Sequence, residues 1–256
     1  MVVAYCRQYG LTVREAVGGY GVVALEVDGE YPWLAFRADM DALPIQEREP
    51  RSSYASQIDG VSHSCGHDAH TSIMLGVVRV ISRFKASLNH NIVFIFQPAE
   101  ETCEGAAAML REQLFGDFQP EQIYALHVYP YLPAGSIGLR KGAMCAAADM
   151  FDVEIKGHGG HAGNVMPESI FFSGTIRSLH AEVHEEIRAR MDYIIRQTAE
   201  TWGARARFTL RQATPVLIND TKILRHATDL FTEYIPDVNL IIFFIRFTAS
   251  DLGSDR

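Results

Sequence analysis

Residues 92–96 read Ile-Val-Phe-Ile-Phe, and this run is one of four that decide the fold class. Short apolar runs of this length, bounded by polar residues, predict strands. The other three runs occupy residues 22–27, 33–37 and 123–128. Glu100 and Glu101 follow the run at 92–96 closely, so two carboxylates that could bind a metal or transfer protons lie just beyond the end of this strand.

Two helix-like segments lie between these runs. In residues 68–85, apolar side chains recur mostly at steps of three or four, which predicts a core-facing helix with Asp68 as its cap. Residues 104–114 are rich in alanine and predict a second helix. Alternating strands and helices are typical of an α/β domain. We therefore expect a mostly parallel sheet, flanked by helices, in a domain that begins with residues 1–147.

The pattern changes near residue 148. Phe151, Val153 and Ile155 alternate with polar residues, as in a half-exposed strand. Further strands are expected at residues 171–177 and 205–210. An amphipathic helix is expected between them, at residues 180–202. These elements predict a smaller α+β satellite domain, residues 148–213, inserted into the first domain. Residues 214–256 are expected to return to that first domain.

Composition narrows the function classes. The 256 residues carry 31 acidic and 23 basic side chains, a formal net charge of −8, which argues against nucleic-acid binding. The most extreme apolar run, residues 240–245, is far shorter than the ~20 residues that span a bilayer. It is better explained as a buried strand. The four cysteines show no disulfide spacing and the first residues resemble no secretion signal, so we expect a cytoplasmic protein without a membrane segment.

Metal-ligating residue types gather where the predicted strands end. Ligands bind at the carboxyl ends of strands in an open α/β sheet. The residues expected at these ends, or just before the first helix, are Asp39, Asp41, Cys65, His67, Glu100, Glu101 and His127. Such side chains bind zinc, manganese or cobalt. Two adjacent glutamates also allow one to coordinate and the other to act as general base.

Each feature also has a purely structural explanation. The two glutamates would be favoured by a helix dipole, and His127 in an apolar strand would be a satisfied core histidine. Cys65 and His67, two apart on extended chain, point the same way but could be structural. Because all these explanations would have to coincide at one sheet edge, we favour a metal site.

Two features of the satellite segment are more ambiguous. The glycines of residues 157–160 could form only a turn, or they could present His161 as a hydrogen-bond donor to a developing oxyanion. Arg177 could be a surface charge or could clamp a substrate carboxylate in a bidentate manner.

Several long motifs resemble the amidohydrolase branch of the M20 metallopeptidases, which hydrolyse N-acyl amino acids, hippurate and auxin conjugates. The matching stretches, in family order, are residues 36–47 (FRADMDALPIQE), 63–70 (HSCGHDAH), 96–101 (FQPAEE), 126–128, 157–162, and 164–167 with 174–177. The resemblance covers nearly everything from about Gly10 to Asp220.

The resemblance implies roles for individual residues. Cys65, His67, Glu101 and His127 resemble ligands of two divalent metal ions, which could be zinc, manganese, cobalt or nickel. Glu100 resembles the general base and Asp41 the carboxylate that orients the site. His161 resembles the oxyanion donor, which the family supplies to the active site of a partner subunit. Asn164 and Arg177 would hold the polar end of the substrate.

The implied function is metal-dependent hydrolysis of the amide bond in N-acyl amino acids or related small conjugates, by a homodimer formed through the satellite domain. A dipeptidase or carboxypeptidase of the same superfamily is an alternative. The family has several tens more residues between Ala162 and Gly163, and a final histidine ligand that has no counterpart after His226. An inactive, truncated remnant that dimerises or binds a ligand is therefore a further alternative.

Overall fold

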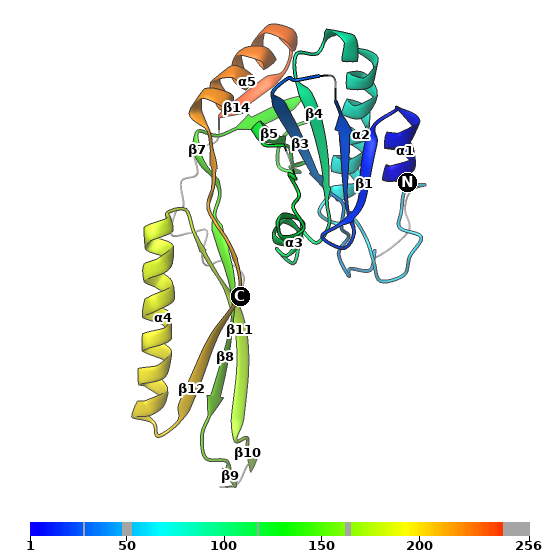
Figure 1. Cartoon of the computed structure of the whole chain (residues 1–256). Coiled ribbons are helices and arrows are strands. Elements are labelled where there is room, and N and C mark those ends of the chain that lie inside the picture. Colours follow the sequence, from blue (N-terminus) through cyan, green and yellow to red (C-terminus); the bar gives the residue numbers. More distant parts are fainter. Residues whose placement is uncertain (28, 48–52, 117, 162–164, 243–256) are drawn as a thin grey trace. The chain divides into compact units, whose positions relative to one another are not determined.

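The computed structural model describes residues 1–27, 29–47, 53–116, 118–161 and 165–242, with only the backbone described at residues 161, 165, 166, 212, 213 and 242. The chain forms two compact units, Met1–Tyr129 and Pro130–Arg256, which are treated separately below (Figure 1). The division into residues 1–147, 148–213 and 214–256 stays a prediction.

The first unit is built around a five-stranded sheet with the order β1-β2-β4-β3-β5. Its elements are α1 (Val2–Gln8), β1 (Thr12–Val17), β2 (Gly21–Glu26), β3 (Trp33–Asp39), α2 (His67–Arg83), the 3-10 helix η1 (Lys85–Ser87), β4 (Asn91–Gln97), α3 (Gly105–Arg111) and β5 (Pro120–Ala125). β3 pairs in parallel with β4 and β5, whereas β1–β2 and β2–β4 are antiparallel. The predicted α/β class is confirmed, but the sheet is mixed, because β1 and β2 form an antiparallel hairpin at its edge.

Helices cover both faces of this sheet. β4 is buried along its whole length, and its alternate side chains enter two different cores. Ile92, Phe94 and Phe96 pack with residues of α1 and α2, whereas Val93 and Ile95 pack in a core that includes α3. Burying each large apolar side chain contributes roughly 1.5–3 kcal/mol to stability. The apolar run at residues 92–96 thus lies in β4, the central strand of this sheet.

The second unit contains a three-stranded antiparallel sheet with the order β11-β8-β12 and the long helix α4 packed on it. Its elements are β6 (Ser136–Leu139), β7 (Gly142–Cys145), β8 (Ala147–Lys156), β9 (Gly160–His161), β10 (Val165–Met166), β11 (Ser169–Ser178), α4 (Ala181–Thr201), β12 (Arg205–Thr214), β13 (Leu217–Asn219), α5 (Thr221–Tyr234) and β14 (Asn239–Ile242). The strands and helix expected for the satellite are therefore present.

A buried ionic cluster fixes α4 on this sheet. The Asp149 side chain of β8 is fully buried, and its Oδ2 lies 3.1 Å from His184 Nε2 and 2.9 Å from Arg188 Nε on α4. A buried carboxylate needs such partners, because an unpaired buried charge is strongly destabilising.

The predicted strand at residues 240–245 is found in part. β14 pairs in parallel with β6, and residues 243–245 lie outside the described residues. Leu240 is half-buried rather than fully buried. Across the described part of the chain, no helix combines the length and apolar character needed to cross a bilayer.

Candidate metal centre

The site lies at the carboxyl edge of the parallel strands β4, β3 and β5. Asp39 is the last residue of β3, Glu100 and Glu101 lie in the turn that follows β4, and His127 follows β5. Because parallel strands end at the same sheet edge, these side chains converge. The strand pairing thus places these side chains at one sheet edge, and their roles stay predictions.

The start of α2 brings two further ligand types to this edge. Gly66, the residue before the helix, has a left-handed φ of +84°, and a Cβ built on it would lie 2.4 Å from Cγ2 of Val128. Only glycine adopts this conformation without strain and leaves that space open. The expected extended geometry of Cys65 and His67 is wrong, because Gly66 turns the chain and His67 is already the first helical residue.

Asp68 does not cap α2 as expected. The N-cap is Gly66, and Asp68 accepts a hydrogen bond from the neighbouring Ala69 N–H at 2.9 Å instead. The Asp68 carboxylate lies in the first turn of α2, where its negative charge interacts favourably with the helix dipole.

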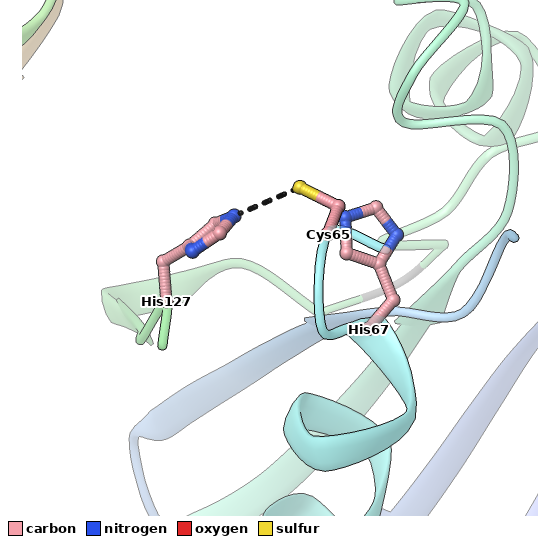
Figure 2. A group of neighbouring side chains, drawn as sticks. All are labelled: Cys65, His67 and His127. Atoms are coloured by element: carbon pink, nitrogen blue, oxygen red, sulfur yellow. Dashed lines mark hydrogen bonds between the residues drawn. The ribbon is translucent and has the colours of Figure 1, made fainter. Parts of the chain in front are cut away.

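Cys65, His67 and His127 form one group of potential ligands (Figure 2). Their ligand atoms lie within 4.8 Å of one another, and Cys65 Sγ is 3.5 Å from His127 Nε2. His127 Nδ1 lies 2.6 Å from the Val128 carbonyl oxygen, which can only accept, so Nδ1 carries the proton. The lone pair of Nε2 therefore faces Cys65. The core-histidine explanation for His127 is wrong, because the residue is exposed in its unit and lies beyond β5.

His67 is the centre of a second group. It is fully buried, and its Nε2 lies 3.8 Å from Glu101 Oε1 and 3.9 Å from Glu100 Oε2. Its Nδ1 lies 3.3 Å from Asp41 Oδ1. Two ligands bound at about 2.1 Å to one ion lie roughly 3–4 Å apart, which is the spacing around His67 Nε2.

Several buried polar atoms at this site have no hydrogen-bond partner within the described part of the chain. They are Asp41 Oδ1, His67 Nδ1, His67 Nε2 and Glu101 Oε1. Leaving a buried donor or acceptor unpaired costs about 1–3 kcal/mol, more for charged groups. A divalent cation beside His67 Nε2 and Glu101 would satisfy both. The residues present therefore fit a metal ion.

Two pKa shifts reflect the crowding of negative charge. Burial, followed by the charge of Glu101, raises the pKa of Glu100 above its ordinary value. Burial, a hydrogen bond with Glu101 and nearby carboxylates raise the pKa of Cys65 to about 12. A metal cation would offset this repulsion and displace the thiol proton.

Glu100 and Glu101 are held in a turn and not at a helix start. α3 begins only at Gly105, so the helix-dipole explanation for the two glutamates is wrong. Ala99, immediately before them, has a left-handed φ of +49°, which costs energy for a residue other than glycine. Asp41 Oδ2 accepts the Glu101 N–H at 3.0 Å and so fixes this turn against β3.

Asp39, a candidate metal ligand in the sequence, forms a buried pair with His70, for which the sequence predicted no role. Their Oδ1 and Nδ1 atoms lie 2.6 Å apart, and both residues are 1% exposed. Burial alone would raise the pKa of Asp39, but the hydrogen bond from His70 and the charge of Arg37, 2.8 Å away, hold it below its ordinary value. The signal was available, because His67 and His70 are three residues apart on one helix face.

A cavity of about 630 Å³ opens beside the site. Asp41 and Glu101 lie on its wall, and its remaining lining is mostly apolar, including Met40, Leu43 and Pro98. Such a mostly apolar cleft with a few polar groups suits a small organic ligand.

The remaining predicted residues belong to the second unit. His161 ends the two-residue strand β9, which pairs with β10, and Arg177 is exposed near the end of β11. Asn164 lies outside the described residues. The six residues of the first unit are thus brought together, and the roles of all nine predicted site residues stay predictions.

Comparison with known proteins identifies the family. Residues 35–250 match the model of Peptidase family M20/M25/M40. The chain belongs to this family. A probable hydrolase of Synechocystis sp. is 33% identical over 84% of this chain and 66% of its own length. An N-acetylcysteine deacetylase of Bacillus subtilis is 31% identical over 82% of this chain and 67% of its own length.

A solved structure of the same family has a closely similar fold. The Bacillus subtilis YXEP protein, described as a dinuclear metal-binding peptidase from the M20 family, superposes with a TM-score of 0.81 at 27% identity. It covers 96% of this chain, which covers 76% of that structure. The chain spans about two thirds of the length of the two curated relatives named above.

Proposed function

We propose that this chain is a metal-dependent hydrolase that cleaves the amide bond of N-acyl amino acids or related small conjugates. The observation that carries the proposal is the convergence of Cys65, His67, Glu101 and His127 at the carboxyl edge of β4, β3 and β5, with unsatisfied atoms on His67 and Glu101. The Bacillus subtilis relative, named as a deacetylase of an N-acyl amino acid, supports the substrate class.

Within this proposal, Cys65, His67, Glu101 and His127 hold two divalent ions, which are zinc, manganese, cobalt or nickel. When bound, such ions lower the pKa of water and polarise the amide carbonyl. Glu100 takes a proton from the attacking water and returns it to the departing amine. Its raised pKa, closer to neutrality, suits both transfers. Asp41 holds the Glu101 turn through its backbone N–H, and its Oδ1 lies 3.3 Å from His67 Nδ1.

The proposal also gives roles to three residues of the second unit. His161 would donate a hydrogen bond to the oxyanion in the active site of a partner subunit, and Asn164 and Arg177 would hold the polar end of the substrate. This part of the proposal is supported by their motif positions. Removing one oxyanion donor typically costs roughly 2.7–4 kcal/mol in the transition state.

We also propose a homodimer, formed through the satellite domain, in the cytoplasm. β11 lies at the edge of its sheet, and its Phe171 side chain is 71% exposed. An exposed apolar edge strand is suited to pairing with another chain. Cys6 and Cys65 are free thiols, in keeping with a reducing compartment.

The test is Glu100→Gln, compared with Glu121→Gln, which alters an exposed glutamate of β5. Glu100→Gln is expected to keep the metal content and to lower turnover of N-acetyl amino acids by about 10²–10⁴-fold, since a general base contributes that much. Glu121→Gln should leave both unchanged. Metal content is measured by mass spectrometry and turnover by amine release.

A panel that includes free dipeptides separates the proposed activity from a dipeptidase. Retained turnover in Glu100→Gln would exclude this residue as the base. A metal-loaded wild-type chain that hydrolyses dipeptides but no N-acyl amino acid would contradict the proposed substrate class.

A further inference from the structure

The His70 ring connects two of the strand ends that build the metal centre. It lies in the first turn of α2 and is 1% exposed. Its Nδ1 is 2.6 Å from Asp39 Oδ1, at the end of β3. Its Nε2 is 2.9 Å from the backbone nitrogen of Val128, the residue after His127.

The two partners determine where the His70 proton resides. The Asp39 carboxylate accepts, so Nδ1–H donates to it. The Val128 N–H donates, so Nε2 accepts and carries no proton. His70 is therefore neutral in its Nδ1–H form, with both nitrogens already used.

This excludes His70 as a metal ligand. Asp39, His67 and His70 have ligand atoms within 4.8 Å of one another and would otherwise form a third candidate group. An ion could reach His70 only by breaking one of its two hydrogen bonds. The ring does, however, contact a proposed ligand, because its centroid is 4.4 Å from that of His127 at an interplanar angle of 65°.

We propose that His70 is a positioning residue that fixes His127 for metal binding. It holds the Val128 amide, packs against the His127 ring and is itself held by Asp39, which Arg37 and Thr71 also anchor. Partners of this kind orient metal-ligating histidines, and their loss typically lowers metal affinity about 10–100-fold. The inference rests on the proposed metal site.

The test compares His70→Phe, His70→Gln and Val78→Ala. Phenylalanine fills the space without polar atoms, whereas glutamine offers both a donor and an acceptor. Val78 is a fully buried residue of the same helix that lies in the apolar core, so Val78→Ala destabilises α2 without altering the His70 hydrogen bonds. Zn²⁺ affinity is measured by calorimetry, and the free energy of unfolding by urea titration.

His70→Phe is expected to weaken Zn²⁺ binding about 10–100-fold, His70→Gln to restore most of it, and Val78→Ala to keep wild-type affinity despite lower stability. Equal affinity in His70→Phe and wild type, or equal losses in His70→Phe and Val78→Ala, would overturn the inference. In the second case the loss would reflect general destabilisation.

A second measurement does not depend on metal or on the folding of a variant. Nitrogen-15 NMR of the metal-free wild-type chain should show His70 in the neutral Nδ1–H form. The Nε2–H form, or a charged ring at neutral pH, would overturn the inference. A wild-type chain with this Nδ1–H form that binds no ion would overturn the proposed function and the inference together, whereas metal binding unaffected by His70→Phe overturns the inference alone.

Discussion

At the scale of single residues, Gly66 determines how Cys65 and His67 reach the same site. The sequence indicates candidate ligand types, because Cys, His and Glu residues cluster in two short motifs. It did not indicate the left-handed turn, since a glycine between Cys65 and His67 is equally compatible with extended chain. Because this turn is not visible in the sequence, the pattern indicates Asp68 as the cap of α2, where the structure has Gly66.

Gly66→Ala is predicted to destabilise the first unit and weaken metal binding. A left-handed conformation costs roughly 1–2 kcal/mol for a residue with a Cβ, and the added methyl would collide with Val128. Gly76→Ala is the control, because Gly76 lies inside α2 with no atom within 4 Å of its Cβ position. It should stabilise the helix by about 0.5–1 kcal/mol. Urea unfolding measures the stability of the two variants. A Gly66→Ala chain as stable as Gly76→Ala would contradict the left-handed conformation assigned to Gly66.

At the scale of elements, the sequence predicted the buried parts of the fold better than the exposed parts. β4 and α2 were found because their side chains pack in one or two cores and therefore follow a regular pattern. α1 was missed because its seven residues are too few to show a helical period.

α5 could have been predicted but was not. Its N-cap, Asp220, accepts hydrogen bonds from the Lys222 and Ile223 N–H groups, which is a recognisable start signal. The exposed end of β5 was placed three residues too late, because Leu126, His127 and Val128 continue its apolar pattern beyond the last pairing with β3.

The Asp39–His70 contact between β3 and α2 is predicted to make the metal-free fold acid-sensitive. Burial lowers the pKa of His70, despite the opposing effect of Asp39, and the pKa of Asp39 is also lowered. A group with a lowered folded-state pKa stabilises the fold above its unfolded-state value and loses that contribution as the pH falls through the folded-state value. The His70 contribution is therefore complete above about pH 6.5 and lost below it, and that of Asp39 is lost only below about pH 3.9.

Urea unfolding between pH 7.5 and 4.5 measures this effect. The free energy of unfolding should fall with pH in the wild type and less steeply in His70→Gln, which has no ring to protonate. His90→Gln, a matched change at a half-buried histidine outside the metal centre, should keep the wild-type slope. Equal slopes in wild type and His70→Gln would show that His70 does not titrate differently in the folded and unfolded chains.

At the scale of the whole molecule, the proposed dimer depends on the second unit. Ile170, Phe171 and Phe172 on edge strand β11 are all exposed. A dimer would have a mass of about 57 kDa, twice the 28.5 kDa of the chain. Light scattering after size-exclusion chromatography should show this mass, reduced toward that of the monomer in Phe171→Asp. Tyr234→Asp, which alters an equally exposed aromatic on α5, should remain dimeric, and a monomeric wild type would exclude the dimer.

The proposal as a whole requires that Cys65 and imidazole or carboxylate ligands share a bound metal ion. X-ray absorption at the zinc edge of the zinc-loaded chain measures these ligands directly. We predict one sulfur at about 2.3 Å together with nitrogen or oxygen at about 2.0–2.2 Å, and loss of the sulfur contribution in Cys65→Ser. A wild-type spectrum without sulfur, or a sulfur contribution that persists in Cys65→Ser, would contradict the proposed metal centre.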